Sequence, residues 1–170
     1  MIISLIGFMG CGKSSVGRRL SELLCCPFMD LDAVIEQQTG QSIPEIFATD
    51  GEAAFRQMEL EVLERILKQS LPSQAILSLG GGTVTQERCA EMVREETVCI
   101  YLRTSVETLV ERLSDEAAGR PMLKGADLRT RIETLMAQRS AIYASTAGHI
   151  IDTDGLSIDE VAQSITRIIM

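Results

Sequence analysis

The sequence predicts a single α/β domain in which helices cover both faces of a five-stranded parallel sheet, giving three layers. Short runs that are apolar throughout alternate along the 170-residue chain with longer segments whose apolar residues recur every three or four positions. Continuous apolar runs are typical of strands that are buried on both faces, as in parallel sheets. A chain of this length also fits one domain of ordinary size.

The expected strands and helices follow one another along the chain. The strand candidates are the apolar runs 2–6, 27–29, 75–79, 98–102 and 149–151. Helical spacing of apolar residues marks the segments 16–24, 106–113, 128–142 and 161–168. Ser105 and Ser157 precede two of these segments as N-cap candidates, and Glu160 completes a capping box with Ser157.

Two segments interrupt the alternation of strands and helices. Residues 42–69 read as a long helical insertion with a break at Asp50-Gly51, whereas residues 114–125 are polar and contain glycines and a proline. Functional loops and lids often have this composition and placement. We therefore expect residues 1–170 to form one domain, with an insertion over about 32–70 and a lid over about 114–125.

The composition restricts the partners and the compartment. A net charge of −8 disfavours binding to nucleic acid and to anionic membranes. The five cysteines include no C-x-x-C pair and there is one histidine, which argues against a disulfide framework and against a zinc site. We expect reduced thiols in a cytoplasmic protein. The apolar run 2–6 has no basic residues before it and leads into glycines, so we expect neither a signal peptide nor a membrane span.

The strongest motif is a phosphate-binding loop. Residues 7–14, Gly-Phe-Met-Gly-Cys-Gly-Lys-Ser, match G-x-x-x-x-G-K-[ST] and lie between an expected strand and an expected helix. The glycines let backbone N–H groups converge on phosphate oxygens, and the helix adds its positive N-terminal end. Lys13 is placed to reach the β- and γ-phosphates of ATP, and the Ser14 hydroxyl is a ligand for Mg²⁺.

Two aspartates offer further support for the metal ion. A GTPase motif N-K-x-D is absent, and the third expected strand ends Leu-Ser-Leu-Gly without the acidic residue found in many P-loop ATPases. Asp30 and Asp32 follow the second expected strand, and in an extended chain they would point to the same side. Ligands gather at the carboxyl ends of the strands in such sheets. The alternative is a solvated strand end, where Asp is common.

Two arginines lie on the apolar stripes of expected helices. Arg139 continues the spacing of Leu128, Ile132 and Leu135, and Arg56 begins a similar stripe. A buried guanidinium requires an anion, and Arg suits planar carboxylates and phosphates. The alternative is a structural ion pair with Glu59 or another acid.

A triple glycine and a loop arginine complete the candidate site. Gly80-Gly81-Gly82 follows the third expected strand and allows the backbone to approach a ligand closely. Arg120 lies within the expected lid, where a swinging arginine would neutralise charge on the transferred phosphoryl group. The ordinary alternative for Arg120 is an exposed loop residue.

Taken together, these motifs resemble shikimate kinase in order and spacing. The resemblance adds to the phosphate loop the following segments: Met-Asp-Leu-Asp (29–32), Ile-Phe-Ala-Thr-Asp-Gly-Glu (46–52), Phe-Arg-Gln-Met-Glu (55–59), Gly-Gly-Gly (80–82), Arg-Pro-Met-Leu (120–123) and Gln-Arg-Ser-Ala-Ile-Tyr (138–143). It implies a P-loop NTPase fold of the nucleoside-monophosphate-kinase type with strand order 2-3-1-4-5. It also implies ATP-dependent phosphorylation of the 3-hydroxyl of shikimate, on the route to chorismate and aromatic amino acids.

The resemblance assigns roles residue by residue. The implied catalytic residues are Lys13, Asp32 and Arg120, and the implied Mg²⁺ ligands are Ser14 and, through a water, Asp30. The implied ATP contacts are Gly10, Cys11, Gly12, Lys13, Ser14, Ser15, Arg112, Arg120, Asp152 and Asp154. The implied shikimate contacts are Asp32, Arg56, Gly80, Gly81, Gly82 and Arg139, with Glu59 orienting Arg56. The expected partners are ATP and shikimate, and we expect a monomer.

Two departures and two alternatives accompany the resemblance. Cys11 stands where Ser is more usual in the family, and Asp154-Gly155 differs from the Asn/Pro-containing segment of some members. Another small-metabolite kinase of the same fold, acting on gluconate or a nucleotide, is the nearest alternative. The other is a non-catalytic ATP-binding module.

Overall fold

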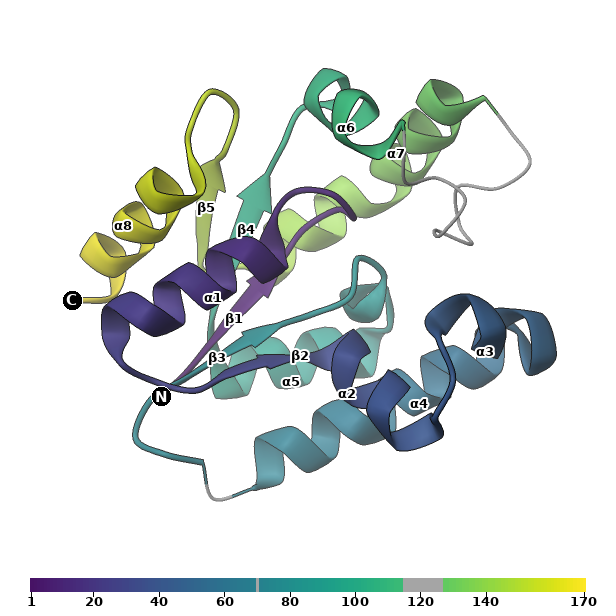
Figure 1. Ribbon diagram of the computed structural model, residues 1–170, viewed down its shortest axis with the longest axis horizontal. Coiled ribbons are helices and arrows are strands. Elements are labelled where there is room, and N and C mark those ends of the chain that lie inside the picture. The colour runs from purple at the N-terminus through teal and green to yellow at the C-terminus, as the bar shows by residue number, and fades with distance from the viewer. Residues whose placement is uncertain (70, 115–126) are drawn as a thin grey trace.

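The protein, described here as a computed structural model for residues 1–69, 71–114 and 127–170, has the expected α/β architecture (Figure 1). Five parallel strands are arranged in the order β2-β3-β1-β4-β5, which confirms the predicted sheet. The strands are β1 (Ile2–Ile6), β2 (Phe28–Asp30), β3 (Ala75–Ser78), β4 (Thr97–Arg103) and β5 (His149–Asp152).

Helices cover both faces of this sheet (Figure 1). The helices are α1 (Lys13–Leu24), α2 (Leu31–Thr39), α3 (Ile43–Thr49), α4 (Gly51–Lys68), α5 (Glu87–Glu96), α6 (Val106–Leu113), α7 (Leu128–Thr146) and α8 (Ile158–Ile169), with a 3₁₀ turn, η1, at Thr83–Thr85. Helices α1 and α8 pack together on one face, and α5 and α7 lie on the other. No helix in the described part of the chain is long and apolar enough to cross a membrane.

The helix boundaries follow the capping signals in the sequence. The Ser105 hydroxyl accepts a hydrogen bond from the Thr108 N–H, and Ser157 and Glu160 form the expected capping box. The expected break near Asp50 separates α3 from α4. A second capping box, formed by Ser42 and Glu45, begins α3 and was not anticipated.

One local prediction was wrong. Asp30 ends β2, but Asp32 lies in the first turn of α2 and not in an extended chain. The Asp30 carboxylate accepts a hydrogen bond from the Ala33 N–H at 3.2 Å, which caps the helix and starts it one residue after the strand. The two side chains are therefore brought together by a helix start rather than by strand alternation.

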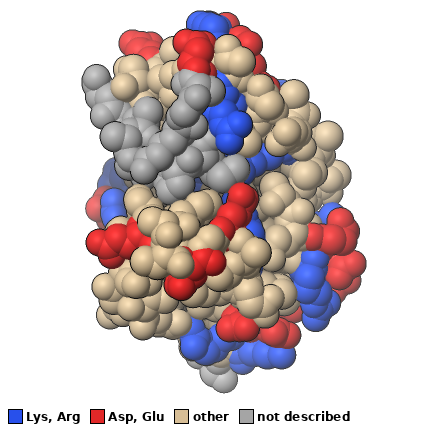
Figure 2. Space-filling model, turned by 90° about the vertical axis from the view of Figure 1, so that its right-hand side faces the viewer, with Lys and Arg blue, Asp and Glu red and all other residues tan. Residues whose placement is uncertain are grey.

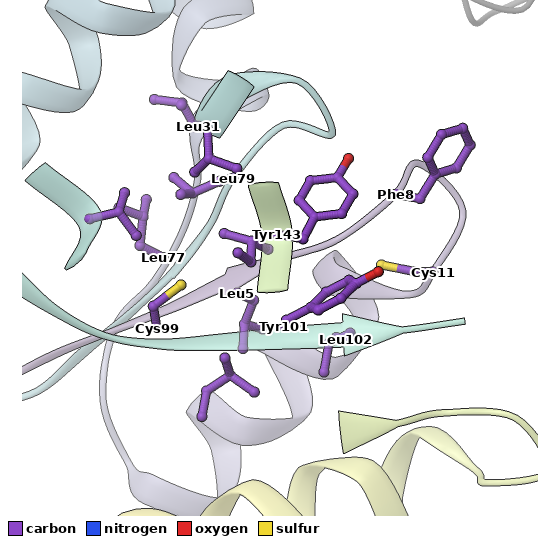
Figure 3. Close-up of a cluster of buried hydrophobic side chains, with 14 of the residues drawn as sticks. Leu5, Phe8, Cys11, Leu31, Leu77, Leu79, Cys99, Tyr101, Leu102 and Tyr143 are labelled. Atoms are coloured by element: carbon purple, nitrogen blue, oxygen red, sulfur yellow. The ribbon is translucent and has the colours of Figure 1, made fainter. Parts of the chain in front are cut away.

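Part of the buried core lies directly beneath the phosphate loop. Tyr101 from β4 and Tyr143 from α7 pack with their ring centroids 5.1 Å apart, next to Phe8 and Cys11 of the loop (Figure 3). All four side chains are almost fully buried. This packing joins the loop after β1 to the helix that carries Arg139.

Candidate active site

The phosphate loop lies between the carboxyl end of β1 and the N-terminus of α1. Gly12, the N-cap of α1, has a left-handed backbone with φ of 97°, a conformation that favours glycine. The Lys13 ammonium is buried and donates hydrogen bonds to the carbonyls of Gly7 at 2.8 Å and Phe8 at 3.0 Å. The loop therefore holds a positive charge beside the positive end of a helix, which suits an anionic ligand.

Two adjoining cavities open at this end of the sheet. The larger, of about 510 Å³, is lined by Met9–Val16, Asp30, Asp32, Ser78–Gly81, Arg112, Thr153, Leu156, Ile158 and Val161. The smaller, of about 260 Å³, is lined by Met9, Asp32, Glu36, Ile43, Pro44, Phe47, Phe55, Arg56, Glu59, Gly80–Gly82 and Arg139. Met9, Asp32, Gly80 and Gly81 belong to both walls, so the cavities meet at these residues.

Ser14 and Asp30 meet in the wall of the larger cavity. The Ser14 hydroxyl donates a hydrogen bond to the Asp30 carboxylate at 2.6 Å. Hydroxyl and carboxylate oxygens are ligands that Mg²⁺ accepts, and this ion usually completes its shell with water and substrate phosphates. The described residues contain no group of three or more His, Cys, Asp or Glu side chains able to hold a metal ion by themselves. The pair therefore fits a Mg²⁺ ion that arrives with a nucleotide.

Asp32 lies at the junction of the two cavities. One of its carboxylate oxygens, Oδ1, is buried and has no hydrogen-bond partner among the described residues. Burial raises the pKa of Asp32 to about 7, and the nearby carboxylates of Glu59 and Asp30 add to the increase while Lys13 opposes it. An unpaired buried acceptor that faces a cavity is suited to accept a hydrogen bond from a ligand hydroxyl.

The smaller cavity contains the two arginines predicted from helical spacing. Arg139 is buried on α7, and its Nη1 atom has no partner among the described residues. Arg56 on α4 donates to the Glu59 carboxylate at 2.5 Å, as the alternative reading proposed, yet it still lines the cavity. Glu59 is fully buried and also accepts a hydrogen bond from the Thr83 hydroxyl at 2.6 Å. One arginine is thus oriented by an acid, and the other has a free donor.

The glycine loop lies against both arginines. A Cβ atom at Gly82 would lie 2.4 Å from Nη2 of Arg56, and one at Gly81 would lie 3.5 Å from Nη1 of Arg139. Any side chain at residue 82 would displace the Arg56 guanidinium. The close approach explains why the sequence has glycine there.

Some of the residues expected to contact the nucleotide line the larger cavity, and others do not. Gly10, Cys11, Gly12, Ser15 and Arg112 line the larger cavity, and Arg112 donates to the Gly10 carbonyl at 3.2 Å. Arg120 lies outside the described residues, as does the expected lid beyond residue 114.

Asp152 and Asp154 do not belong to that cavity wall. Arg103 forms an ion pair with Asp152 at 2.6 Å, and the Asp154 carboxylate accepts a hydrogen bond from the Ser105 N–H at 3.2 Å. Thr153, which lies between Asp152 and Asp154, does line the wall, as do three residues that were not predicted, namely Leu156, Ile158 and Val161. The apolar side chains of the segment that follows β5 were the signal for these contacts.

The raised pKa of Asp32 predicts that the stability of the ligand-free protein depends on pH. The pKa of Asp32 rises from 3.8 to about 7 in the folded protein, so folding favours the protonated carboxyl. Stability should fall as the pH increases from about 4 to about 7, and the loss should be complete above that range. Asp32→Asn removes this loss. The melting temperature of the variant minus that of the wild type, measured in EDTA, should be larger at about pH 8.5 than at about pH 5.5.

Asp152→Asn is the matched control for this measurement. Its hydrogen bond from Arg103 lowers the pKa of Asp152, so that the carboxylate is ionised in the folded and the unfolded protein throughout this range. The corresponding difference in melting temperature should be the same at both pH values. A difference for Asp32→Asn that does not grow with pH would contradict the assigned burial.

Known proteins match the chain along nearly its whole length. A model of the family described as shikimate kinase matches residues 9–170. The shikimate kinase of Chlorobium chlorochromatii is 40% identical, over 98% of this chain and 89% of the relative. The shikimate kinase of Mycobacterium avium is 43% identical, over 88% of this chain and 82% of the relative.

Solved structures show the same similarity. The shikimate kinase from Acinetobacter baumannii, solved in complex with shikimate, has a TM-score of 0.93 and 34% identity, covering 99% of this chain and 92% of that one. The shikimate kinase from Aquifex aeolicus has a TM-score of 0.82 and 31% identity, covering 99% and 96%. Sequence and structure agree, and this chain belongs to the shikimate kinase family.

Proposed function

We propose that the protein transfers the terminal phosphoryl group of ATP to the 3-hydroxyl of shikimate, giving shikimate 3-phosphate and ADP. The observation that carries this proposal is the junction of the two cavities at Asp32, with the phosphate loop on one side and Arg56 and Arg139 on the other. The larger cavity suits a nucleotide. The smaller one presents guanidinium groups to a small carboxylic acid and a buried carboxylate oxygen to its hydroxyls.

The proposed mechanism is an in-line transfer that depends on positioning and charge. Lys13 neutralises charge on the phosphates, and Arg120 adds a second cation. Arg56 and Arg139 hold the substrate carboxylate, and Asp32 accepts the proton of the attacking hydroxyl. Ser14 and Asp30 would hold Mg²⁺, which supplies charge stabilisation when bound.

We also propose that residues 1–170 are one domain in which the helical insertion of about residues 32–70 contributes the acceptor site. The residues of that insertion which line the smaller cavity support this division, and they include Asp32, Phe47 and Arg56. A cytoplasmic monomer that binds neither nucleic acid nor membranes is the form that we propose. On the face shown in Figure 2, acidic and basic side chains are interspersed. The net charge of −8, taken from the sequence, disfavours binding to polyanions.

A substrate panel tests the proposed function directly. Coupled ADP release should be stimulated by shikimate and not by gluconate or nucleoside monophosphates. Nucleoside monophosphates have no carboxylate for Arg56 and Arg139, and gluconate carries its carboxylate and hydroxyls on a flexible open chain that loses more conformational entropy on binding than a ring does. Turnover of gluconate or a nucleotide would favour another kinase of the same fold. ATP binding without any turnover would favour a regulatory module.

Arg139→Lys should raise the KM for shikimate about tenfold or more and leave the KM for ATP nearly unchanged. A lysine keeps the charge but cannot make two parallel hydrogen bonds to a carboxylate. Initial rates at saturating ATP measure the effect. The control is Arg129→Lys on the same helix, where the arginine is exposed and pairs with Glu107 and Glu133. An unchanged shikimate KM in Arg139→Lys would contradict the proposal that Arg139 binds the substrate carboxylate.

A further inference from the structure

The three carbonyl groups of the glycine loop are held in two different ways. The Gly80 carbonyl accepts a hydrogen bond from the Thr83 N–H at 3.3 Å, and the Gly82 carbonyl accepts one from the Thr85 N–H at 3.1 Å. These bonds are local and form part of the turn at η1. The Gly81 carbonyl instead accepts a hydrogen bond from the Tyr143 hydroxyl, which lies 62 residues further along the chain.

Tyr143 is held firmly in this position. Its side chain is fully buried on α7, one helical turn after Arg139, and its ring packs against Tyr101 at an interplanar angle of 42°. Burial raises the pKa of Tyr143, although the Arg139 charge opposes the shift, so the hydroxyl remains protonated and remains a donor. Helix α7 therefore carries Arg139, which lines the acceptor cavity, and Tyr143, which donates a hydrogen bond to Gly81 in the wall of that cavity.

We propose that Tyr143 is a positioning residue for the acceptor substrate, because its hydroxyl fixes the glycine loop at a set distance from Arg139. The peptide between Gly81 and Gly82 is planar and trans, so a bond to the Gly81 carbonyl also fixes the direction of the Gly82 N–H. Glycine backbones can adopt many conformations, and the bond from Tyr143 restricts the one peptide of this loop whose carbonyl the local turn bonds leave unpaired. This inference rests on the proposed function and deepens it.

The Tyr143→Phe variant tests the inference. It keeps the ring in the core and removes only the donor, which leaves the Gly81 carbonyl without its hydrogen bond. The KM for shikimate should rise about fivefold to tenfold, while the KM for ATP should change less than about twofold. Amide hydrogen exchange should become faster in the peptide that covers residues 79–86 and stay unchanged in the phosphate loop.

The Tyr101→Phe variant is the matched control. Tyr101 belongs to the same ring pair and is equally buried, but its hydroxyl has no partner among the described residues and points toward Cys11 rather than toward the glycine loop (Figure 3). Both KM values and the exchange of residues 79–86 should therefore match the wild type. A purely structural role for Tyr143 would lower the melting temperature without separating the two KM values.

The outcomes separate this inference from the proposed function. If the wild-type protein shows no shikimate-dependent ADP release, the proposed function is wrong. If amide exchange at residues 79–86 is unchanged in Tyr143→Phe, the Tyr143 hydroxyl does not hold the glycine loop, whatever the activity. In an active enzyme, the inference is overturned if Tyr143→Phe leaves the shikimate KM within about twofold of the wild type. It is also overturned if both KM values rise equally, or if Tyr101→Phe has the same effect.

Discussion

Asp32→Asn is expected to lower kcat for shikimate phosphorylation by about 10²- to 10⁴-fold. Asparagine keeps the size of the side chain and can still accept a hydrogen bond, but it cannot take the proton from the attacking hydroxyl. Asp32 is the acidic side chain that lines both cavities next to the glycine loop, which is where the hydroxyl and the terminal phosphate must meet. Steady-state rates at saturating ATP and shikimate measure the loss.

The control for this prediction is Asp50→Asn, an equal change of charge at an exposed carboxylate between α3 and α4. Its kcat should equal that of the wild type. The Asp32→Asn variant should also remain folded, because it removes a buried carboxyl that is costly to ionise. A kcat for Asp32→Asn within about fivefold of the wild type would show that the reaction needs no base at this position.

Lys13→Met should lower kcat by about 10²- to 10³-fold. The lysine is buried beside the N-terminus of α1, where a positive charge acts through a medium of low dielectric constant and is weakly screened. Methionine has a similar length and no charge. The lost charge stabilises the transferring phosphoryl group more than ground-state ATP, so kcat should fall more than the affinity for ADP measured by calorimetry.

Lys68→Met provides the comparison for the loss of one ammonium group. Lys68 is exposed at the end of α4, where it pairs with Glu64, so its removal should leave kcat unchanged. A raised ATP KM with a normal kcat in Lys13→Met would mean that the lysine binds substrate and transition state equally.

The sequence was sufficient for the sheet and for the phosphate loop because each depends on local pattern. The continuous apolar runs marked every strand, and the loop motif marked the N-terminus of α1, which lies in the wall of the larger cavity. The inward orientation of Arg139 was also predictable, because a charged residue on the apolar stripe of a helix points into the protein and requires an anion there. The burial of Arg139 agrees with that argument, as does its Nη1 atom, which has no partner within residues 1–69, 71–114 and 127–170.

Other parts of the site depend on contacts that the apolar pattern and the loop motif do not reveal. Asp32 was placed in an extended chain because the cap made by Asp30 was not recognised, and this cap depends on a single hydrogen bond. The bond from Tyr143 to Gly81 could not be predicted, because tyrosine on an apolar stripe reads as core packing. The contacts after β5 were assigned to Asp152 and Asp154 by resemblance, whereas Leu156 and Ile158 line the cavity.

The shared wall of the two cavities has a consequence for inhibitor chemistry. Since Met9, Asp32, Gly80 and Gly81 border both spaces, the two cavities adjoin with at most one layer of residues between them. A single compound that joins an adenosine to a ring-shaped carboxylic acid through a phosphate-length linker should occupy both at once. Such a compound should bind more tightly than either half alone, because binding of one half raises the effective concentration of the other at its site. Its selectivity over other ATP-binding proteins would come from the carboxylic acid half.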